Sequence, residues 1–540
     1  MTKSWWRDAV IYQVYPRSFA DGNGDGIGDL AGVRARLPYL RWLGVDAIWF
    51  SPWYASPMAD AGYDVADYRA IDPIFGTLAE AESLIAEAHD LGIRIIVDVV
   101  PNHLSTKHPW FEAALAAGPG SPERELFWFR RGRGAEGELA PTDWTSYFGG
   151  GTWTRVEDGE WYLHLFDSSQ PDLNWEHPTV RAEFESVLRF WFDRGVDGIR
   201  IDSAVLLTKD PSLPEVNGAS KHPFTDRDDV HDIYRAWRRV AESYEEKRAL
   251  IGEVWLPDKQ RFADYLRPDE LHSAFNFDFL CCPWEAPQLR AVISETLSAH
   301  ASVGAPTTWV LSNHDVTRHV TRYGRQDTSF SFAARRHGVP VDLPLGRRRA
   351  RAAVLLALAL PGAAYVYQGE ELGLWEAEDI PSEQRQDPMW HRTAHVDPGR
   401  DGCRVPLPWS ESAAPFGFSP RDATGKPWLP QPSEWSEHTV EKQTGDPASM
   451  LELYRTALAL RRSAAALGDG PLIWLDTTDH VLAFTRTAPA QSTPSSRAFA
   501  CVVNLSAASV RLPPHGEILL ASGPLDDGQL PADTAVWLSM

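Results

Sequence analysis

Three short apolar runs of the sequence each end in a carboxylic acid. The acids are Asp202, Glu253 and Asp315, and each stands at the end of a predicted β-strand. Carboxyl side chains can act as nucleophiles and as general acids or bases. Any one of them could be a solvated acid or part of an ion pair, but three acids that end three strands of one sheet indicate a catalytic site.

Arg200 precedes Asp202 by two residues. Side chains two positions apart on an extended strand point to the same face, so the guanidinium would keep the Asp202 carboxylate ionised. Glu253 is followed by Val254 and Trp255 and has no adjacent cation in the sequence. Its pKa could therefore be raised, as a proton donor at neutral pH requires.

Two histidines lie close to these strand ends. His103 closes a segment that begins at Asp98, and His314 directly precedes Asp315. Either could ligate a metal, but neither lies in a His-x-x-x-His or similar array. Hydrogen bonding to a polar ligand is the interpretation that we favour.

A glycine-rich acidic loop near the start has the pattern of a cation site. The run Asp21-Gly-Asn-Gly-Asp-Gly-Ile-Gly-Asp29 places oxygen side chains at alternate positions, with glycines for a tight turn. An EF-hand loop begins in the same way, but Gly32 stands where its chelating glutamate would be. The alternative is a glycine-rich turn with hydrated acids.

The elements that must position these residues alternate between strand and helix. Short β-branched and aromatic runs alternate with amphipathic stretches, which is typical of a parallel sheet. The predicted strands are Val10–Val14, Asp46–Phe50, Arg94–Val99, Gly198–Asp202, Leu250–Glu253, His272–Phe277, Thr307–Leu311 and Ala364–Tyr367. The predicted helices are Leu30–Leu43, Thr77–Leu91, Pro178–Asp193, Asp228–Glu246, Pro287–His300, Arg347–Leu360 and Met450–Arg462. Eight strands with intervening helices predict an α/β fold, the (β/α)₈ TIM barrel, whose active site lies at the carboxyl ends of the strands.

Two parts of the chain depart from this alternation. The segment 104–174 is rich in Gly, Pro, Trp and charge and lacks helical periodicity, which predicts an inserted lobe after the third strand. From residue 464 the pattern changes to strands without long helices, which predicts a small C-terminal all-β sandwich. The expected domains are a catalytic barrel (1–103 and 175–463), an inserted lobe (104–174) and the C-terminal sandwich (464–540). The loop-like segment 369–446 is too long for a simple connection, so we expect it to wall a site.

The composition is that of a large globular protein. The chain has 540 residues, 43% of them hydrophobic and 23% charged, with a net charge of −22. Nucleic acid and anionic membranes both select basic surfaces, so neither is expected as a partner. The longest apolar run, Ala352–Leu360, is far shorter than the roughly 20 residues that span a bilayer.

The cysteines and the amino terminus indicate the cellular compartment of the protein. Cys281, Cys282, Cys403 and Cys501 fit no metal spacing, and the first two are adjacent, which is a poor geometry for a disulfide. The amino terminus lacks the continuous apolar stretch of a secretory signal. We expect reduced thiols and a cytoplasmic protein, as a monomer or homodimer.

Taken together, the strand ends resemble the four short signature regions of the α-amylase superfamily, glycoside hydrolase family 13, and the resemblance covers nearly the whole chain. The segments that carry it are Asp98–His103, Gly198–Asp202, Gly252–Trp255 and Ser312–Asp315, with further matches at Asp8–Arg17, Gly62–Tyr68 and Gln170–Asn174. The last is similar to the fifth region of the oligo-1,6-glucosidase and α-glucosidase branch. Gly399–Trp409 resembles the α-glucosidase pattern Gly/Ser-Arg-Asp-x-x-Arg-Thr-Pro-Met-x-Trp, with Val405 and Leu407 as departures.

The resemblance implies roles for individual residues. Asp202 would be the nucleophile, Glu253 the general acid/base, and Asp315 the carboxylate that holds the sugar hydroxyls and stabilises the transition state. The implied substrate-binding residues are Tyr63, Asp64, His103, Arg200, Ser203, His314, Arg404 and, as the weaker candidate, Arg400. Tyr63 would be a stacking platform, with a buried core tyrosine as the alternative. A surface ion pair is the alternative for the two late arginines.

The acidic loop is similar to the metal loop that follows the first barrel strand in this branch of the family. The implied ligands of one structural Ca²⁺ or Mg²⁺ ion are Asp21, Asn23, Asp25, Asp29 and the Ile27 carbonyl. No organic cofactor is implied.

The implied activity is that of a retaining exo-acting α-glucosidase that removes glucose from maltose and short maltooligosaccharides, with transglucosylation as a side activity. A sucrose isomerase, trehalose synthase or amylosucrase of the same family is the alternative, because the first half-reaction is shared. A non-catalytic barrel, like the ectodomains of amino-acid transporter heavy chains, is disfavoured because those lack the catalytic residues.

Ser203 is the implied selector of linkage. In family members a valine after the nucleophile goes with α-1,6 bonds, and smaller or polar residues go with α-1,4 bonds. The resemblance therefore predicts a preference for maltose over isomaltose. The alternative is that Ser203 only packs or caps the turn after the strand.

Overall fold

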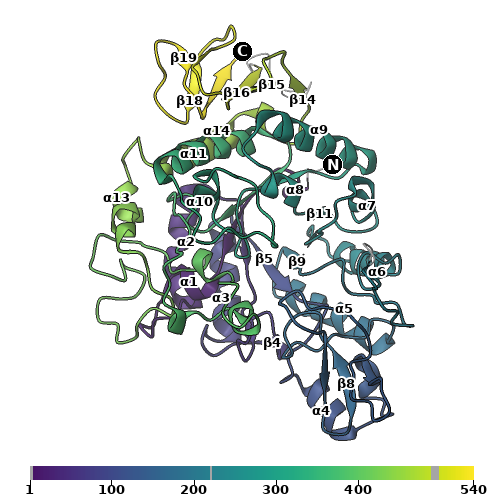
Figure 1. The fold of residues 1–540 in the computed structure, drawn as a ribbon. Helices are drawn as coiled ribbons and strands as arrows, with labels where there is room; N and C mark the ends of the chain where they lie inside the picture. Colours follow the sequence, from purple (N-terminus) through teal and green to yellow (C-terminus); the bar gives the residue numbers. More distant parts are fainter. Residues whose placement is uncertain (1–3, 219–221, 488–497) are drawn as a thin grey trace.

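Eight parallel strands form the centre of the molecule in the computed structural model, which describes residues 4–218, 222–487 and 498–540 (Figure 1). The strands are β1 (Val10–Val14), β2 (Ala47–Phe50), β5 (Arg94–Val99), β9 (Gly198–Ile201), β10 (Ala249–Gly252), β11 (Ser273–Ala274), β12 (Thr308–Val310) and β13 (Ala363–Tyr367). They pair in the order β11-β10-β9-β5-β2-β1-β13-β12. Between β11 and β12 the Thr308 hydroxyl donates to the Ala274 carbonyl (2.5 Å). The sheet is therefore a nearly closed barrel, as predicted.

The predicted strands lie at their expected positions, except that the sixth is much shorter. The segment His272–Phe277 forms a strand only at Ser273–Ala274, and Phe277 already begins α8 (Phe277–Cys281). The side chain of Asn276 accepts the Phe279 amide hydrogen. This helix cap stops the strand early, because the chain leaves the extended conformation to form it.

Helices surround the barrel. They are α1 (Pro16–Phe19), α2 (Leu30–Leu43), α3 (Leu78–Asp90), α5 (Pro178–Phe192), α6 (Val230–Glu242), α7 (Lys259–Asp264), α9 (Ala286–Val303), α10 (His319–Tyr323), α11 (Leu343–Ala359), α12 (Pro388–Arg392), α13 (Val440–Gln443) and α14 (Met450–Ser463). Short 3₁₀ helices lie at Trp5–Arg7, Arg124–Leu126, Ser382–Gln384, Asp401–Cys403, Ser433–His438 and Ala465–Leu467. Each of the seven predicted helices is present. α3 starts at a capping box in which Thr77 and Glu80 exchange side-chain-to-backbone hydrogen bonds, which fixes its first turn.

The chain between β5 and α5 forms an inserted lobe, at the lower right of Figure 1. It contains β6 (Phe129–Arg131), β7 (Trp153–Arg155) and β8 (Glu160–Leu163), paired in the order β6-β8-β7. The lobe also contains the helix α4 (Pro109–Ala117), which the sequence did not indicate. Only Phe111 and Ala114 of this helix are buried, so it carries no long apolar period. A two-stranded ribbon of β3 (Tyr54–Ala55) and β4 (Asp67–Ile71) follows β2.

The C-terminal part is all β. The strands β14 (Leu472–Trp474), β15 (Val481–Arg486), β16 (Phe499–Asn504), β20 (Thr534–Ser539) and β18 (Ile518–Ala521) form one antiparallel sheet in this order, and β17 (Val510–Arg511) pairs with β19 (Gln529–Leu530). The larger sheet packs on the barrel through α11, because the Trp537 indole donates to the Leu355 carbonyl and Arg486 to the Ala359 carbonyl. The division at residues 103, 174 and 463 stays a prediction.

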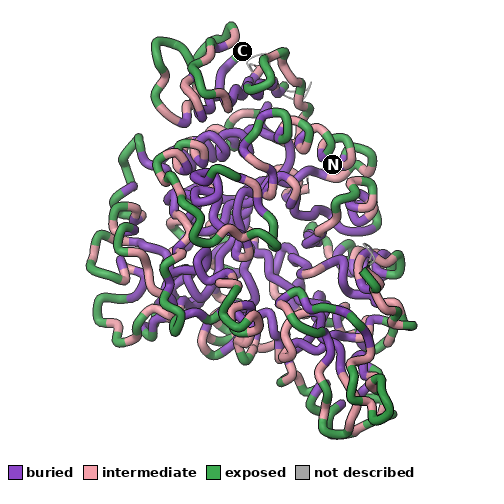
Figure 2. Tube along the Cα trace, in the orientation of Figure 1, coloured by how far each residue is buried: buried purple, intermediate pink, exposed green. Residues whose placement is uncertain are grey.

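The core lies in and around the barrel (Figure 2). The barrel interior is filled by apolar side chains, among them Ile11, Trp49, Ile96, Ile251 and Phe275. A barrel packed in this way is a solid support and not a pore. Polar groups must therefore act from the strand ends.

Two observations concern membranes and thiols. Within the described residues, no helix combines the length and apolar character needed to cross a membrane. All four cysteines are free thiols, and three of them are buried.

Candidate active site

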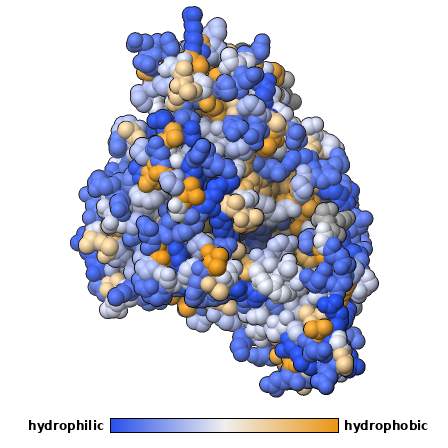
Figure 3. Space-filling model, in the orientation of Figure 1, coloured by the Kyte–Doolittle hydropathy of each residue, from blue (hydrophilic) through white to orange (hydrophobic). Residues whose placement is uncertain are grey.

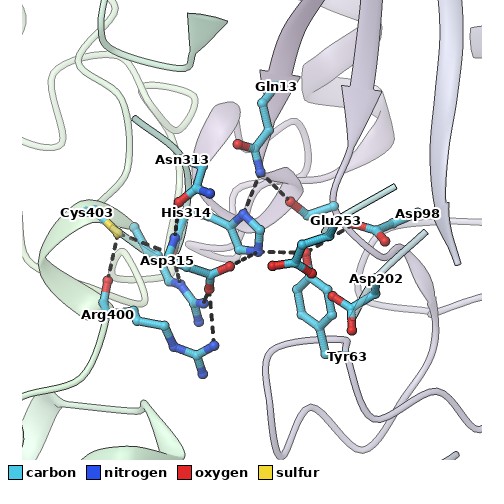
Figure 4. Close-up of polar contacts among 12 residues, drawn as sticks. Gln13, Tyr63, Asp98, Asp202, Glu253, Asn313, His314, Asp315, Arg400 and Cys403 are labelled. Atoms are coloured by element: carbon cyan, nitrogen blue, oxygen red, sulfur yellow. Dashed lines mark hydrogen bonds and ion pairs between the residues drawn. The ribbon is translucent and has the colours of Figure 1, made fainter. Parts of the chain in front are cut away.

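The three acids at the strand ends lie together (Figure 4). Asp202 follows β9, Glu253 follows β10, and Asp315 comes five residues after β12. The surface is hollowed near its middle, close to where β5 and β9 are labelled in Figure 1 (Figure 3). The barrel thus brings the acids to one region.

Arg200 on β9 is the hub of the charged contacts. Its Nη1 lies 3.0 Å from Asp98 Oδ1 and 2.6 Å from Asp202 Oδ1. Its Nη2 lies 2.7 Å from Glu253 Oε2. The contact with Asp202 is the same-face pairing that the sequence predicts. The sequence does not predict the contact of Arg200 with Glu253, because the two residues belong to neighbouring strands.

Glu253 is poised to hold a proton near neutral pH. Burial raises the pKa of its carboxyl to about 7, Arg200 opposes the rise, and the charges of Asp202 and Asp315 add to it. Its Oε2 accepts the Ser203 amide hydrogen (2.9 Å), and its Oε1 accepts the Trp255 indole hydrogen (3.0 Å). The expected rise in pKa is present in spite of a neighbouring cation, because burial dominates.

Asp315 is held in the ionised form. Its Oδ1 accepts from Arg404 Nη2 (2.9 Å) and Arg400 Nη1 (3.2 Å), and its Oδ2 lies 3.3 Å from His314 Nε2. Burial alone would raise the pKa of Asp315, but His314 and the arginines outweigh it and lower the pKa below its usual range. Glu253 and Asp315 therefore differ in protonation near neutral pH.

His314 and Tyr63 form a stacked pair beside the acids. Their rings are nearly parallel, with centroids 5.3 Å apart, and the Tyr63 hydroxyl lies 2.6 Å from His314 Nε2. The same hydroxyl donates to Asp98 Oδ2 (3.1 Å), and Gln13 Nε2 lies 2.7 Å from His314 Nδ1. Burial holds the pKa of His314 well below its usual value, so the ring is neutral.

His103 enters the site from the segment after β5. Its Nε2 lies 3.0 Å from Gln170 Nε2 and 3.1 Å from the Tyr63 carbonyl. Burial lowers its pKa to about 4, so this ring is also neutral. Neutral imidazoles can exchange hydrogen bonds with uncharged hydroxyl groups.

The structure places Asp64 in a turn of its own segment. Its oxygens accept hydrogen bonds from the Ser56 hydroxyl and from the amides of Ala59 and Asp60, so it stabilises its own turn. Asp60 faces the site instead, with Oδ1 2.6 Å from Arg400 Nη2 and Oδ2 3.1 Å from Gln170 Nε2. Burial raises the pKa of Asp60 to about 7, and Arg400 opposes this rise.

Ser203 lies directly at the acids. Its hydroxyl donates to Asp202 Oδ2 (2.8 Å), while its amide donates to Glu253. Its φ of 47° is in the left-handed region, which few non-glycine residues adopt. The strained turn lets one residue contact both acids.

Arg400 and Arg404 are buried and form no surface ion pair. Both contact Asp315, and Arg400 also contacts Asp60 and Asp387. Arg400, which the sequence made the weaker candidate, thus contacts three carboxylates. The segment after β13 does wall the site.

Some residues of this cluster carry no signal in the sequence. Asp387 holds Arg400 through Nε (2.6 Å). Burial alone would raise its pKa, but Arg400 and Arg404 outweigh it and lower it to about 2. No local pattern marks Asp387. Gln170 and Asp98 begin the segments Gln170–Asn174 and Asp98–His103, and the resemblance of these segments to family signature regions is the signal that could identify them.

The acidic loop folds around its own backbone. Asp21 accepts the amide hydrogens of residues 23, 24 and 26, and Asp29 accepts those of residues 22, 23 and 32. Asn23 accepts from Asp25, and Asp25 from Ile27. In the ranges that the structure describes, no three His, Cys, Asp or Glu side chains form a group that could hold a metal ion on their own. The donors suit a hard cation in type, but here they serve the loop amides.

The sequence is similar to known glycoside-acting enzymes over most of its length. The model of the α-amylase catalytic domain matches residues 13–470. A Rhizobium meliloti (strain 1021) protein named "probable alpha-glucosidase" is 38% identical over 90% of this chain and 87% of its own. The Escherichia coli (strain K12) trehalose-6-phosphate hydrolase is 37% identical over 87% of this chain and 88% of its own. The Parageobacillus thermoglucosidasius oligo-1,6-glucosidase is 33% identical over 90% and 89%.

The fold is similar to solved structures of the same kind. The crystal structure of an alpha-glucosyl transfer enzyme superposes with a TM-score of 0.84 at 34% identity, covering 99% of both chains.

Proposed function

The chain belongs to the α-amylase family, glycoside hydrolase family 13, in its α-glucosidase branch, and from this membership we propose that it is a retaining, exo-acting enzyme that hydrolyses maltose and short maltooligosaccharides. The observation that carries the proposal is the buried Arg200 guanidinium, which contacts Asp202 and Glu253 at once. This arrangement keeps the two carboxyl groups close, as a retaining mechanism requires.

In the first half-reaction, Asp202 attacks the anomeric carbon of the terminal glucose. The bond from that carbon to the glycosidic oxygen breaks, and Glu253 gives its proton to the departing oxygen. Arg200 and Ser203 orient the attacking carboxylate. The products of this step are a glucosyl ester of Asp202 and the shortened sugar.

In the second half-reaction, the Glu253 carboxylate takes a proton from water, and the water oxygen attacks the anomeric carbon. The ester bond breaks and Asp202 leaves as a carboxylate. Two inversions give α-glucose. A sugar hydroxyl in place of water gives a transfer product, and the solved alpha-glucosyl transfer enzyme supports this as a second activity of the same intermediate.

The remaining polar residues hold the glucose. Asp315 is ionised and accepts hydrogen bonds from sugar hydroxyls, while Arg400 and Arg404 orient it. His103 and His314 exchange hydrogen bonds with hydroxyls as neutral rings. We assign to Asp60, which contacts Arg400 and Gln170, the sugar-binding role that the resemblance implied for Asp64.

The linkage preference rests on Ser203. Its side chain lies beside Asp202, where the departing sugar must dock. A small polar side chain there favours the α-1,4 bond of maltose, as the family resemblance implies.

We also propose that the loop 21–29 binds one Ca²⁺ or Mg²⁺ ion with a structural role. The support is its oxygen-only donor set and its place at the start of α2, where Asp29 is the helix cap. No step of the reaction involves this ion.

Substitution of the three acids tests the proposal. We expect each of the variants Asp202→Asn, Glu253→Gln and Asp315→Asn to lower kcat on an aryl α-glucoside by about 10³-fold or more. The variants remove, in this order, the nucleophile, the general acid/base and the carboxylate that stabilises the transition state. Asp197→Asn is the control, because Asp197 stands at the opposite end of β9 and contacts His89. Near-normal kcat in folded Asp202→Asn would remove Asp202 as the nucleophile.

Product analysis completes this test. The first glucose released, followed by NMR, is expected in the α configuration, and a β product would show inversion. Maltose, isomaltose, sucrose and trehalose are compared by anion-exchange chromatography. Sucrose converted to an isomer, with little glucose set free, would show that transfer and not hydrolysis is the main activity.

A further inference from the structure

A chain of hydrogen bonds links Arg400 to the inserted lobe. Arg400 Nη2 contacts Asp60, and Asp60 accepts from Gln170 Nε2. Gln170 Oε1 in turn accepts the amide hydrogen of Asp167 (2.9 Å). The lobe residues 167–170 are thereby tied to the barrel.

The chain returns to Arg400 through α12. Arg392, the last residue of α12, places Nη1 3.2 Å from Asp167 Oδ2. Asp387 caps the start of the same helix and holds Arg400 Nε. The contacts therefore form a closed ring through the lobe, the barrel and the segment after β13.

Arg392 also holds a glycine turn of the lobe. Its Nε and Nη2 donate to the Gly149 carbonyl (3.1 and 2.8 Å), and Nη2 also lies 3.3 Å from the Gly151 carbonyl. Gly149 and Gly150 have φ of 93° and 76°, which glycine adopts without strain. Phe148 of this turn packs on Arg400, whose guanidinium carbon lies 5.0 Å from the ring centroid.

The planar guanidinium of Arg392 suits this task. It carries donors in a fixed fork that can serve two carbonyls and one carboxylate together, which an ammonium group cannot match. Its side chain and that of Asp167 are each 18% exposed, so the pair is largely shielded from water. Burial alone would raise the pKa of Asp167, but hydrogen bonds from Ser169 and the charge of Arg392 outweigh it, and the carboxylate is ionised.

The ring lies at one end of the site. Asp202 and Glu253 lie on one side of Asp315, and Arg400 lies on the other (Figure 4). The departing sugar leaves from the Glu253 side. The opposite end of the bound glucose then faces Arg400, which contacts Asp387, Asp60 and the Phe148 ring.

We propose that Arg392 is a positioning residue that closes this end of the site and so restricts the enzyme to glucose at the end of a chain. The inference rests on the proposed function, and it assigns to Arg392 the restriction of cleavage to the terminal glucose. Arg392 touches no reacting atom. It acts through the glycine turn, which seats Phe148 on Arg400, and through Asp167.

The test compares Arg392→Met with Arg385→Met. Arg385 lies in the same segment, packs on Trp390 and donates to the carbonyls of Pro398 and Glu378, but these partners are all in its own part of the chain. Arg392→Lys is a second variant, which keeps the charge but loses the fork. Circular dichroism and melting temperature establish that each protein is folded.

The deciding measurement is the rate on a maltoheptaoside whose terminal O4 and O6 are blocked by an ethylidene group, divided by the rate on the unblocked chain. We expect this ratio to rise by about tenfold or more in Arg392→Met, the factor for losing one hydrogen bond to a charged group. The ratio in Arg392→Lys should lie between those of the wild type and Arg392→Met, and the ratio in Arg385→Met should equal that of the wild type. The KM for maltose should rise in Arg392→Met with little change in kcat.

An unchanged ratio in folded Arg392→Met overturns the inference, as does an equal rise in Arg385→Met. If Arg392→Met is unfolded, the ratio in Arg392→Lys decides in the same way. Cleavage of the blocked chain by the wild type is a different outcome, because it removes the exo action that belongs to the proposed function.

Discussion

The indole of Trp255 donates a hydrogen bond to the carboxyl group that must carry the catalytic proton. Glu253 must be protonated in the first half-reaction, and its pKa is raised to about 7. The groups that face it are Arg200, Asp202, Asp315 and the Ser203 amide. Because a raised pKa keeps the acid protonated only below that value, we expect kcat/KM to fall as pH rises through about 7.

Substitution of the indole tests this assignment. A hydrogen bond to the ionised form favours that form, so Trp255→Phe should raise the pKa of Glu253 and move the fall in kcat/KM to higher pH by about one unit. The phenyl ring keeps the stacking on Phe277, which lies parallel at 3.6 Å between centroids. Phe277→Leu is the control, since it loosens the stack and keeps the indole hydrogen. A pH profile of Trp255→Phe that coincides with the wild type would contradict the role.

Ser203 combines a functional position with a strained backbone. We expect the wild type to prefer maltose, and Ser203→Val to shift kcat/KM toward isomaltose by about 10–200-fold at most, the range for one or two methyl groups. A β-branched residue at φ 47° is strained, so the melting temperature should also fall.

Ser203→Ala separates shape from hydrogen bonding. Both variants lose the hydroxyl that donates to Asp202, so any common loss of kcat comes from that contact. Only the valine adds bulk beside the departing sugar. A wild type that prefers isomaltose, or a linkage ratio that does not move in Ser203→Val, would exclude Ser203 as the selector.

At the scale of elements, the acidic loop determines how α2 begins. Stabilisation by a bound ion grows as RT ln(1 + [L]/Kd), or about 2.7 kcal/mol at 100 times Kd. We expect EDTA to lower the melting temperature by a few degrees and Ca²⁺ or Mg²⁺ to restore it, with the initial rate at low temperature unchanged. Differential scanning calorimetry with and without EDTA measures this.

Asp25→Ala is the matched variant, because its carboxylate is exposed and accepts from the Ile27 amide within the loop. It should melt at the same temperature with and without EDTA. A melting temperature of the wild type that EDTA does not change would contradict the ion site. An immediate loss of activity that Ca²⁺ restores, without a change in melting, would indicate a catalytic metal.

The elements themselves were largely predictable from the sequence, and the exceptions have local causes. Barrel strands and their helices carry strong apolar patterns, so their order and most of their bounds follow from residue types. The helix α4 buries only Phe111 and Ala114 and gives no such pattern. Asp60 contacts Arg400 and Asp64 does not, and this difference depends on the turn between the two acids. In that turn, Ala61 and Gly62 have φ of 53° and 106°. Residue spacing does not reveal which acid such a turn directs inward.

At the scale of the whole molecule, the site joins parts that are far apart in the sequence. Asp202, Glu253 and Asp315 could be found because each follows its own strand. Arg400 and Asp60 stand 340 positions apart, and Arg392 and Gly149 stand 243 apart. Their contacts depend on how the lobe and the segment after β13 pack on the barrel, and packing of this kind leaves no periodic mark on the chain.

The pairing of β1 with β13 has a consequence for synthesis on the ribosome. Val10 pairs with Ala364, so the first strand waits for a partner that is made much later. At 5–20 residues per second, roughly 350 residues take about 20–70 s. Throughout that time one edge of β1 is open and could pair with another nascent chain. The growing polypeptide must therefore be shielded, by its own helices or by a chaperone, until the eighth strand emerges.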